Sequence, residues 1–244
     1  MISALKAEFR KLFTVRSTYV LIIVALLFDI FLAGFVKGYQ FQGSQPGDIW
    51  TLQSSMIVAV SITSVFVAII ALLLITHEYR YNTILYSMTA NRSRTVLLFS
   101  KFIAITVFSL VITVMLAGLA PLMTYIGAGL GGHDLVAQHF AWGDIVWKIL
   151  FYGWGTSIIA LLIGVLIRSQ IGAIVIYFLM PTTIEGLLSL LLKENVAYLP
   201  FTSLGIVIDK SQVLTSAEAA MVFIGYMVIG WAVAWALFLK RDAN

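Results

Sequence analysis

The sequence predicts an all-α membrane protein that crosses the bilayer six times. Hydrophobic residues make up 61% of its 244 positions and charged residues 11%, whereas soluble domains contain roughly 45–50% and 25%. The mean hydropathy is +1.02, and six apolar runs reach the length of about 20 residues that a helix needs to cross the hydrocarbon. Because lipid offers the backbone no hydrogen-bond partners, we expect these spans to be helices.

Residues 1–16 are predicted to form an amphipathic helix in the membrane interface. Apolar residues recur every three or four positions, which puts them on one face of a helix, and basic residues occupy the opposite face. The apolar face holds Ile2, Leu5, Phe9 and Leu12, and the basic face holds Lys6, Arg10 and Lys11. Such a helix either anchors the chain or also contacts a partner subunit.

Six spans follow within what we interpret as a single transmembrane domain, residues 1–244. They are predicted at about residues 17–36, 50–76, 102–127, 146–167, 170–192 and 219–239.

Pro181 predicts a break in the fifth span, because proline removes a backbone donor. The glycine-rich stretch at 127–132 is interpreted as an exit turn of the third span. Hydroxyl residues of the second span and glycines of the fourth are interpreted as packing positions.

The distribution of basic residues predicts that both termini are cytoplasmic. Eleven of the fifteen Lys and Arg residues fall on the side of the termini, and positive charge favours the cytoplasmic face. The other side carries Lys37, Lys148, Lys193 and Lys210. The net charge of +4 is thus explained by contact with an anionic inner leaflet, and we expect no nucleic-acid partner.

No catalytic, cofactor-binding or metal site is predicted. The chain has no cysteine, no phosphate-binding loop and no zinc-protease or serine-hydrolase signature. His133 and His139 lie six positions apart on an exterior loop, and a metal site there is the less favoured interpretation.

Two acidic residues fall inside predicted spans, where ionisable groups are costly and mark functional sites by default. Asp29 lies about 18 Å into the first span, and it either hydrogen-bonds a Ser, Thr or Tyr of a neighbouring helix or lines a substrate or ion path. Glu185 follows Pro181 by four positions. With Thr182, it is expected to meet backbone groups freed at the proline.

Residues 77–101, HEYRYNTILYSMTANRSRTVLLFSK, interrupt the apolar background between the second and third spans. A solvated basic loop is one interpretation. The amphipathic stretch around Ile84, Leu85 and Met88, followed by Arg92 and Arg94, favours a docking surface instead.

This segment resembles the permease subunits of type-2 ATP-binding-cassette (ABC) transporters. Their segment reads Glu, three residues, Gly-Thr, an apolar residue, then Pro-x-Ser-Arg and a Lys seven positions later. Matching positions are Glu78, Thr83, Ile84, Ser93, Arg94 and Lys101, whereas Asn82, Asn91 and Ser100 replace the usual Gly, Pro and Gly. Asn tolerates left-handed and turn geometry. The N-terminal LKAEFRKLFTVRS and the segment YLPFTSLG from Tyr198 resemble the same family.

The resemblance implies a permease in the cytoplasmic membrane that forms the translocation path. A separate cytoplasmic ATPase would bind ATP and Mg²⁺, and a second permease, identical or homologous, would complete the transporter. Residues 78–94 would form coupling helices resting on the ATPase. Polar contacts would come from Glu78, Arg80, Arg92 and Arg94, with Thr83 at the turn. By the same analogy, the transporter would export an amphipathic or hydrophobic compound such as a drug, an antimicrobial peptide or a lipid.

Two other classes of function remain open at this point. An ion-coupled secondary transporter would use Asp29 and Glu185 as coupling carboxylates, and it would tend to contain an inverted repeat, which the spans do not reveal. A membrane scaffold or an intramembrane enzyme is the second alternative, and the lack of a catalytic constellation argues against the enzyme.

Overall fold

The computed structural model describes residues 2–39, 48–90, 93–132, 142–209 and 211–240, and these contain helices but no strand. Ten α-helices are α1 (Ile2–Thr14), α2 (Arg16–Asp29), α3 (Asp48–Arg80), α4 (Ile84–Ala90), α5 (Arg94–Leu130), α6 (Trp142–Ile167), α7 (Gln170–Leu179), α8 (Glu185–Leu192), α9 (Pro200–Ile208) and α10 (Ser216–Lys240). Two π-helical segments, η1 (Ile30–Tyr39) and η2 (Met180–Ile184), and the 3₁₀ segment η3 (Lys193–Tyr198) continue or join them.

Six helical stretches are long and apolar enough to cross a membrane, which confirms the predicted all-α, six-span class. They are Arg16–Tyr39, Leu52–Arg80, Arg94–Leu130, Trp142–Ile167, Gln170–Tyr198 and Ser216–Lys240. Each overlaps one of the predicted runs, and several extend well past it because the helices continue into polar sequence. The first span is composite, with α2 continuing directly into η1, and the fifth is built from α7, η2, α8 and η3.

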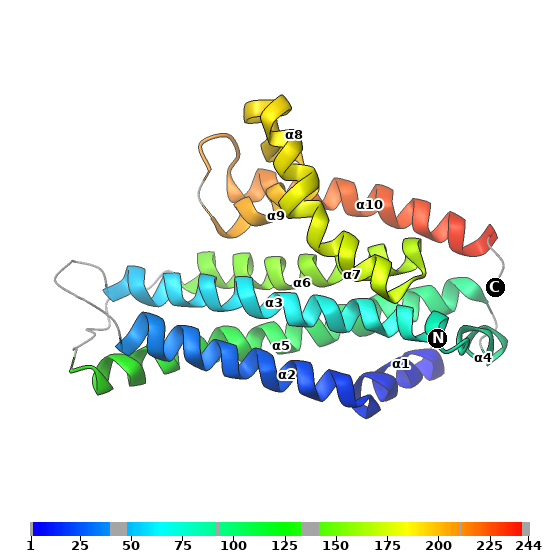
Figure 1. The fold of residues 1–244 in the computed structure, drawn as a ribbon, viewed down its shortest axis with the longest axis horizontal. Helices are drawn as coiled ribbons and strands as arrows, with labels where there is room; N and C mark the ends of the chain where they lie inside the picture. Colours follow the sequence, from blue (N-terminus) through cyan, green and yellow to red (C-terminus); the bar gives the residue numbers. More distant parts are fainter. Residues whose placement is uncertain (1, 40–47, 91–92, 133–141, 210, 241–244) are drawn as a thin grey trace.

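Helices α3, α5 and α6 form the centre of the bundle, as Figure 1 shows, while α7 and α8 lean away from it. Small residues let the central helices approach closely. A Cβ on Gly164 of α6 would come within 2.6 Å of Ile75 in α3, and one on Gly153 would come within 2.2 Å of the Thr113 hydroxyl in α5. The interpretation of these glycines as packing positions is therefore confirmed.

The hydroxyl residues of α3 satisfy their own helix. Ser55, Ser61, Thr63 and Ser64 donate to backbone carbonyls three or four positions earlier, at 2.6–3.1 Å. A hydroxyl that donates to a carbonyl of its own helix has no hydrogen left to donate to a neighbouring helix. These side chains therefore pack as small residues.

The glycine-rich stretch at 127–132 is not only an exit turn, because α5 continues as far as Leu130. Gly127 packs against the backbone of η1, where an added Cβ would lie 1.9 Å from the Gly34 carbonyl oxygen. Only Gly132, with φ 77°, has the left-handed conformation of a turn. The predicted end of the third span at residue 127 is thus too early.

The fifth span breaks at the expected place. Pro181 lies in η2, between α7 and α8, and the Thr182 hydroxyl donates to the Phe178 carbonyl at 2.7 Å. A π-helical turn relaxes the hydrogen-bond ladder around the missing proline donor. The backbone adjustment is thus local, and α8 resumes directly after it.

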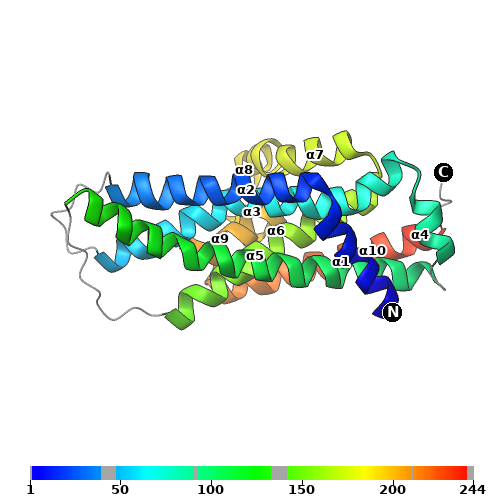
Figure 2. The same ribbon diagram turned by 90° about the horizontal axis from the view of Figure 1, so that it is seen from below.

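Helix α1 packs obliquely against the bundle beside α5, as seen from below in Figure 2. Its buried side chains are Ala4, Glu8 and Leu12, and Leu5 and Phe9 pack against the core. Ile2, predicted on the apolar face, is 86% exposed. The inward face therefore differs from the predicted one, since it holds an acid at its centre.

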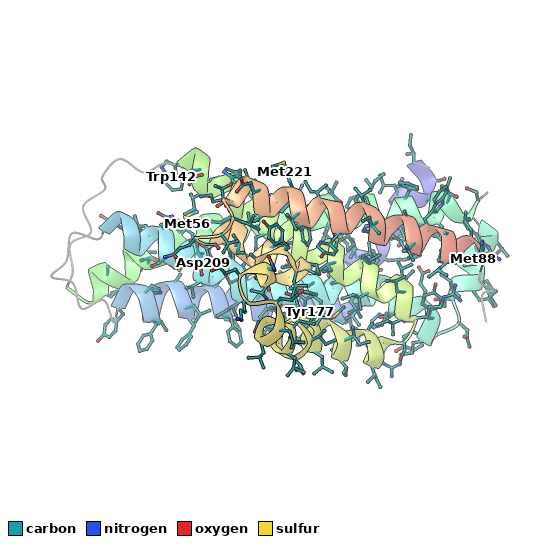
Figure 3. All side chains as sticks on the ribbon, turned by 90° about the horizontal axis from the view of Figure 1, so that it is seen from above. Met56, Met88, Trp142, Tyr177, Asp209 and Met221 are labelled. Atoms are coloured by element: carbon teal, nitrogen blue, oxygen red, sulfur yellow. The ribbon has the colours of Figure 1, made fainter. Side chains whose placement is uncertain are left out.

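Both chain ends lie at the same end of the bundle in Figure 1, together with α4. Figure 3 shows Met88 of α4 at this end and Trp142, at the start of α6, at the opposite end. The structure thus gathers most cations of the predicted cytoplasmic side at one end. That this end faces the cytoplasm stays a prediction.

Candidate functional site

A tight turn joins α3 to α4 at the end of the bundle. Asn82 has φ 53°, the left-handed conformation that asparagine tolerates better than most residues. Asn therefore fits this position, where the pattern that the sequence resembles has Gly. Thr83 is exposed in the same turn, as expected, and its carbonyl accepts from the Ser87 N–H at 3.1 Å.

Helix α4 and the turn before it present an exposed apolar and aromatic surface beyond the bundle. Ile84 is 1% exposed and anchors the helix to the core, whereas Tyr81, Leu85 and Tyr86 are 62%, 47% and 76% exposed. Exposed apolar groups that cluster on one short element mark an interaction site more often than scattered ones do. This exposed surface, Tyr81, Leu85 and Tyr86, is called the α4 surface below.

The start of α5 is capped by the sequence that suggested the resemblance. The Ser93 side chain accepts from the Val96 N–H at 3.2 Å, as an N-cap does. Arg94 donates to the Leu239 carbonyl of α10 at 3.1 Å. Asn91 and Arg92 lie outside the described residues, so the predicted role of Arg92 stays a prediction.

Arg80, at the end of α3, connects this region to the fifth span. Its guanidinium donates to the Gln170 side chain at 3.0 Å and lies 5.5 Å from the centroid of the Tyr81 ring. Arg80 thus bonds the end of α3 to α7, and Arg94 bonds the start of α5 to α10. Helix α4 lies between these two ends in the chain.

Behind α4, four charged side chains form what we call the buried ion network: Glu8, Lys11, Glu78 and Lys101. Lys101 is fully buried, and its ammonium lies 2.8 Å from Glu8 Oε2 and 2.6 Å from Glu78 Oε1. Lys11 lies 2.7 Å from Glu8 Oε1 and 2.5 Å from Glu78 Oε1, and it also donates to the Ser87 hydroxyl at 3.3 Å. The network connects α1, α3, α4 and α5.

The buried ion network contains two positive and two negative charges, so its net charge is zero. Burial of a charge is tolerated only with a partner, and breaking a buried pair typically costs about 3–5 kcal/mol. Burial by itself lowers the pKa of Lys11, but the carboxylates of Glu78 and Glu8 outweigh this and raise the pKa above its ordinary value of 10.5. All four groups therefore hold one another in place.

This placement changes the interpretation of Glu78. The resemblance implied a polar contact with a partner, but its side chain is 6% exposed and Oε1 is already held by two lysines. A residue buried in this way positions α3 within the chain and is not available to an external surface. Any coupling role of Glu78 therefore acts through the buried ion network.

Glu8 was not singled out in the sequence, although a signal was present. It falls between Leu5 and Leu12 on the inward face of α1, where an acid needs a buried cation. Lys101 was noticed for its spacing in the segment, and pairing it with Glu8 requires the tertiary structure because 93 positions separate them.

The family model described as "ABC-2 family transporter protein" matches residues 4–185, about three quarters of the chain. The chain belongs to this family. It is a permease of the type-2 ABC transporters, a multi-pass protein of the cytoplasmic membrane. No curated protein matches the chain. The matched range includes α4 and all four members of the buried ion network.

Asp29 of the permease is fully buried where α2 passes into η1. Neither of its carboxylate oxygens has a hydrogen-bond partner in the part of the chain that the structure describes. The expected bond to a hydroxyl of a neighbouring helix is therefore wrong, and hydroxyls such as that of Thr63 donate to their own helix instead. A role for Asp29 in a pathway stays a prediction.

Glu185 has a structural partner, although not the expected one. Its two oxygens accept from the backbone N–H groups of Phe201 and Thr202 at 2.8 and 2.7 Å, and from the Thr202 hydroxyl at 2.7 Å. These groups belong to the first turn of α9, whose Pro200 has no N–H. Glu185 thus caps α9, in the segment from Tyr198 that carried part of the resemblance, and does not meet the backbone freed at the proline.

Proposed function

We propose that this permease forms the translocation path of a transporter powered by a separate cytoplasmic ATPase, which docks on the α4 surface. The observation that supports it most is the arrangement at this end of the bundle. An exposed helix stands directly over a buried network of charges that joins it to α1 and to the second and third spans.

The proposal requires that a movement of the ATPase reach the membrane, and rigid, connected helices can transmit it. A docked ATPase that changes shape on binding or hydrolysing ATP would move α4, and helices joined by close ion pairs would carry that motion into α3 and α5. Arg80 and Arg94 would extend the movement to α7 and α10, because each bonds one of these helices. Alternating access would follow from this tilt.

We further propose that two permeases, identical or homologous, line the path and that the transporter exports an amphipathic or hydrophobic compound. A second permease would find an apolar surface on the membrane-facing helices. Spans five and one expose large apolar residues, such as Ile171 at 77%, Leu190 at 75% and Leu27 at 60%, for which lipid or a second subunit is the natural environment. Drugs, antimicrobial peptides and lipids are the substrate classes implied.

The docking assignment is tested with Leu85→Asp in the complex of the full-length permease and its ATPase. A charge placed in the centre of an apolar interface weakens binding by about tenfold or more. Affinity for the ATPase and stimulation of ATP hydrolysis by the permease are both measured. The control is Leu130→Asp, an exposed leucine at the far end of α5. Equal affinity for both variants would contradict docking on α4.

A further inference from the structure

A cleft of about 810 Å³ opens between the junction of α1 with α2 and the facing ends of α3 and α4. Its volume lies in the range of sites that hold small molecules, about 300–1,000 Å³. The floor is apolar and includes Leu12, Ile70, Leu73 and Leu74, while the hydroxyl residues Ser17, Thr18 and Thr83 also line it. The cleft therefore combines a hydrocarbon-like floor with polar groups.

One side chain gives the cleft its net charge. Lys11 and Glu78 line it too, but both belong to the buried ion network, whose charges cancel. Arg16 also lines the cleft, is exposed, and has no hydrogen-bond or ion-pair partner among the described residues. An unpaired guanidinium presents a planar fork of donors that matches phosphate oxygens.

The surroundings of Arg16 favour an anion as well. Arg16 begins α2, and the preceding residue, Val15, gives the helix no side-chain cap. The Thr18 N–H donates to the Val15 carbonyl at 3.1 Å, which leaves the N–H groups of Arg16 and Ser17 at this helix start, and such groups favour a negative charge. The side chains of Ser17 and Thr18 line the same cleft and add hydroxyl donors to it.

We propose that this cleft binds a membrane phospholipid, with its phosphate on Arg16 and the start of an acyl chain along the leucine floor. A free phosphate ion would use the polar part alone and leave the apolar floor in water. An amphiphile satisfies both parts. The cleft lies at the end of the bundle predicted to be cytoplasmic, where inner-leaflet headgroups are found.

The test is a titration of the full-length permease, purified in a neutral detergent, with short-chain phosphatidylglycerol, followed by native mass spectrometry. Arg16→Gln is expected to weaken binding about tenfold or more, as expected for lost hydrogen bonds to a charged group. Arg16→Lys keeps the charge without the fork and is expected to lie in between. Arg10→Gln is the matched control, because Arg10 is exposed on α1 and does not line the cleft.

Two further arms separate the possible ligands. Inorganic phosphate and neutral diacylglycerol, each at the lipid's concentration, are expected not to displace the lipid, and Leu73→Trp is expected to weaken binding by filling the floor. Displacement by inorganic phosphate would overturn the lipid assignment in favour of a free anion site. Equal affinities of the Arg16→Gln and Arg10→Gln variants would overturn the site itself. ATPase docking is measured with a different residue and readout, so either proposal can fail alone.

Discussion

Glu78, near the end of the second span, and Glu185, inside the fifth, are both buried glutamates, but the structure satisfies them in opposite ways. Glu78 accepts from two lysines that come from α1 and α5. Glu185 accepts from neutral donors in the first turn of α9, 16 and 17 positions later. The first arrangement joins elements far apart in the chain, and the second closes a local loop.

Under the coupling proposed above, the Glu78 end would transmit motion between helices and the Glu185 end would keep the shape of one segment. An ion network across three helices resists separation of all of them together, whereas a capped helix is stabilised on its own. We therefore expect substitutions at the Glu78 end to affect both global stability and coupling, and those at the Glu185 end to remain local.

The largest effect is expected for Lys101→Met. The substitution leaves Glu8 and Glu78 buried with only the half-buried Lys11 as a partner, and breaking a buried pair costs about 3–5 kcal/mol. Thermal unfolding of the purified permease measures the loss. Lys148→Met is the control, since Lys148 pairs with Asp144 on the same helix and such pairs contribute about 1 kcal/mol or less. A smaller loss for Lys101→Met than for the control would mean that the network does not hold the helices.

Glu185→Gln is expected to have an intermediate and local effect. The amide keeps one acceptor oxygen but loses the charge, and loss of a helix cap costs about 0.5–2 kcal/mol. Hydrogen exchange at the Phe201 and Thr202 amides is expected to speed up, while ATPase stimulation is expected to stay unchanged. Glu194→Gln, at an exposed position in η3, serves as the control. Loss of ATPase stimulation in the Glu185→Gln variant would contradict the purely local role of Glu185.

The smallest effect is expected for Lys11→Gln, about 1 kcal/mol or less, because the Lys11 side chain is 35% exposed. Its pKa is raised in the folded protein, so the stabilisation is fully present below the unfolded value of 10.5 and is lost as the pH rises through the folded pKa. The stability difference between wild type and variant is therefore expected to be constant from about pH 7 to 9 and to shrink only above about pH 10.5. A difference that shrinks by pH 8 would contradict the pairing.

Much of the fold could be predicted because bilayer thickness and backbone hydrogen bonding leave few alternatives for long apolar runs. The six spans, the break at Pro181 and the packing role of Gly153 and Gly164 all follow from residue type and spacing. The end of the third span was wrong because Gly127 serves helix contact. A glycine in a close approach looks the same in the sequence as a glycine in a turn.

The candidate site was only partly predictable for a different reason. Local sequence identified the turn around Asn82, because a turn depends on neighbouring residues, whereas the cap at Ser93 was not predicted. The partners of Glu78, Asp29 and Glu185 depend on which helices meet. Hydropathy identifies the residues of a span but does not say which neighbour each one faces, so the expected partners of Asp29 and Glu185 were wrong. Glu8 was missed for the same reason, because its partner Lys101 comes from a distant helix.

The distance along the chain between Glu8 and Lys101 also sets an order of events during synthesis. Lys101 is 93 positions later, so the ribosome has released the first two spans before the third delivers this ammonium group to the membrane. Until then Glu8 and Glu78 lack their fully buried partner, and Lys11 is the one cation of the network that they have. We therefore expect the N-terminal helix to reach its final position late in biogenesis, after the third span has inserted.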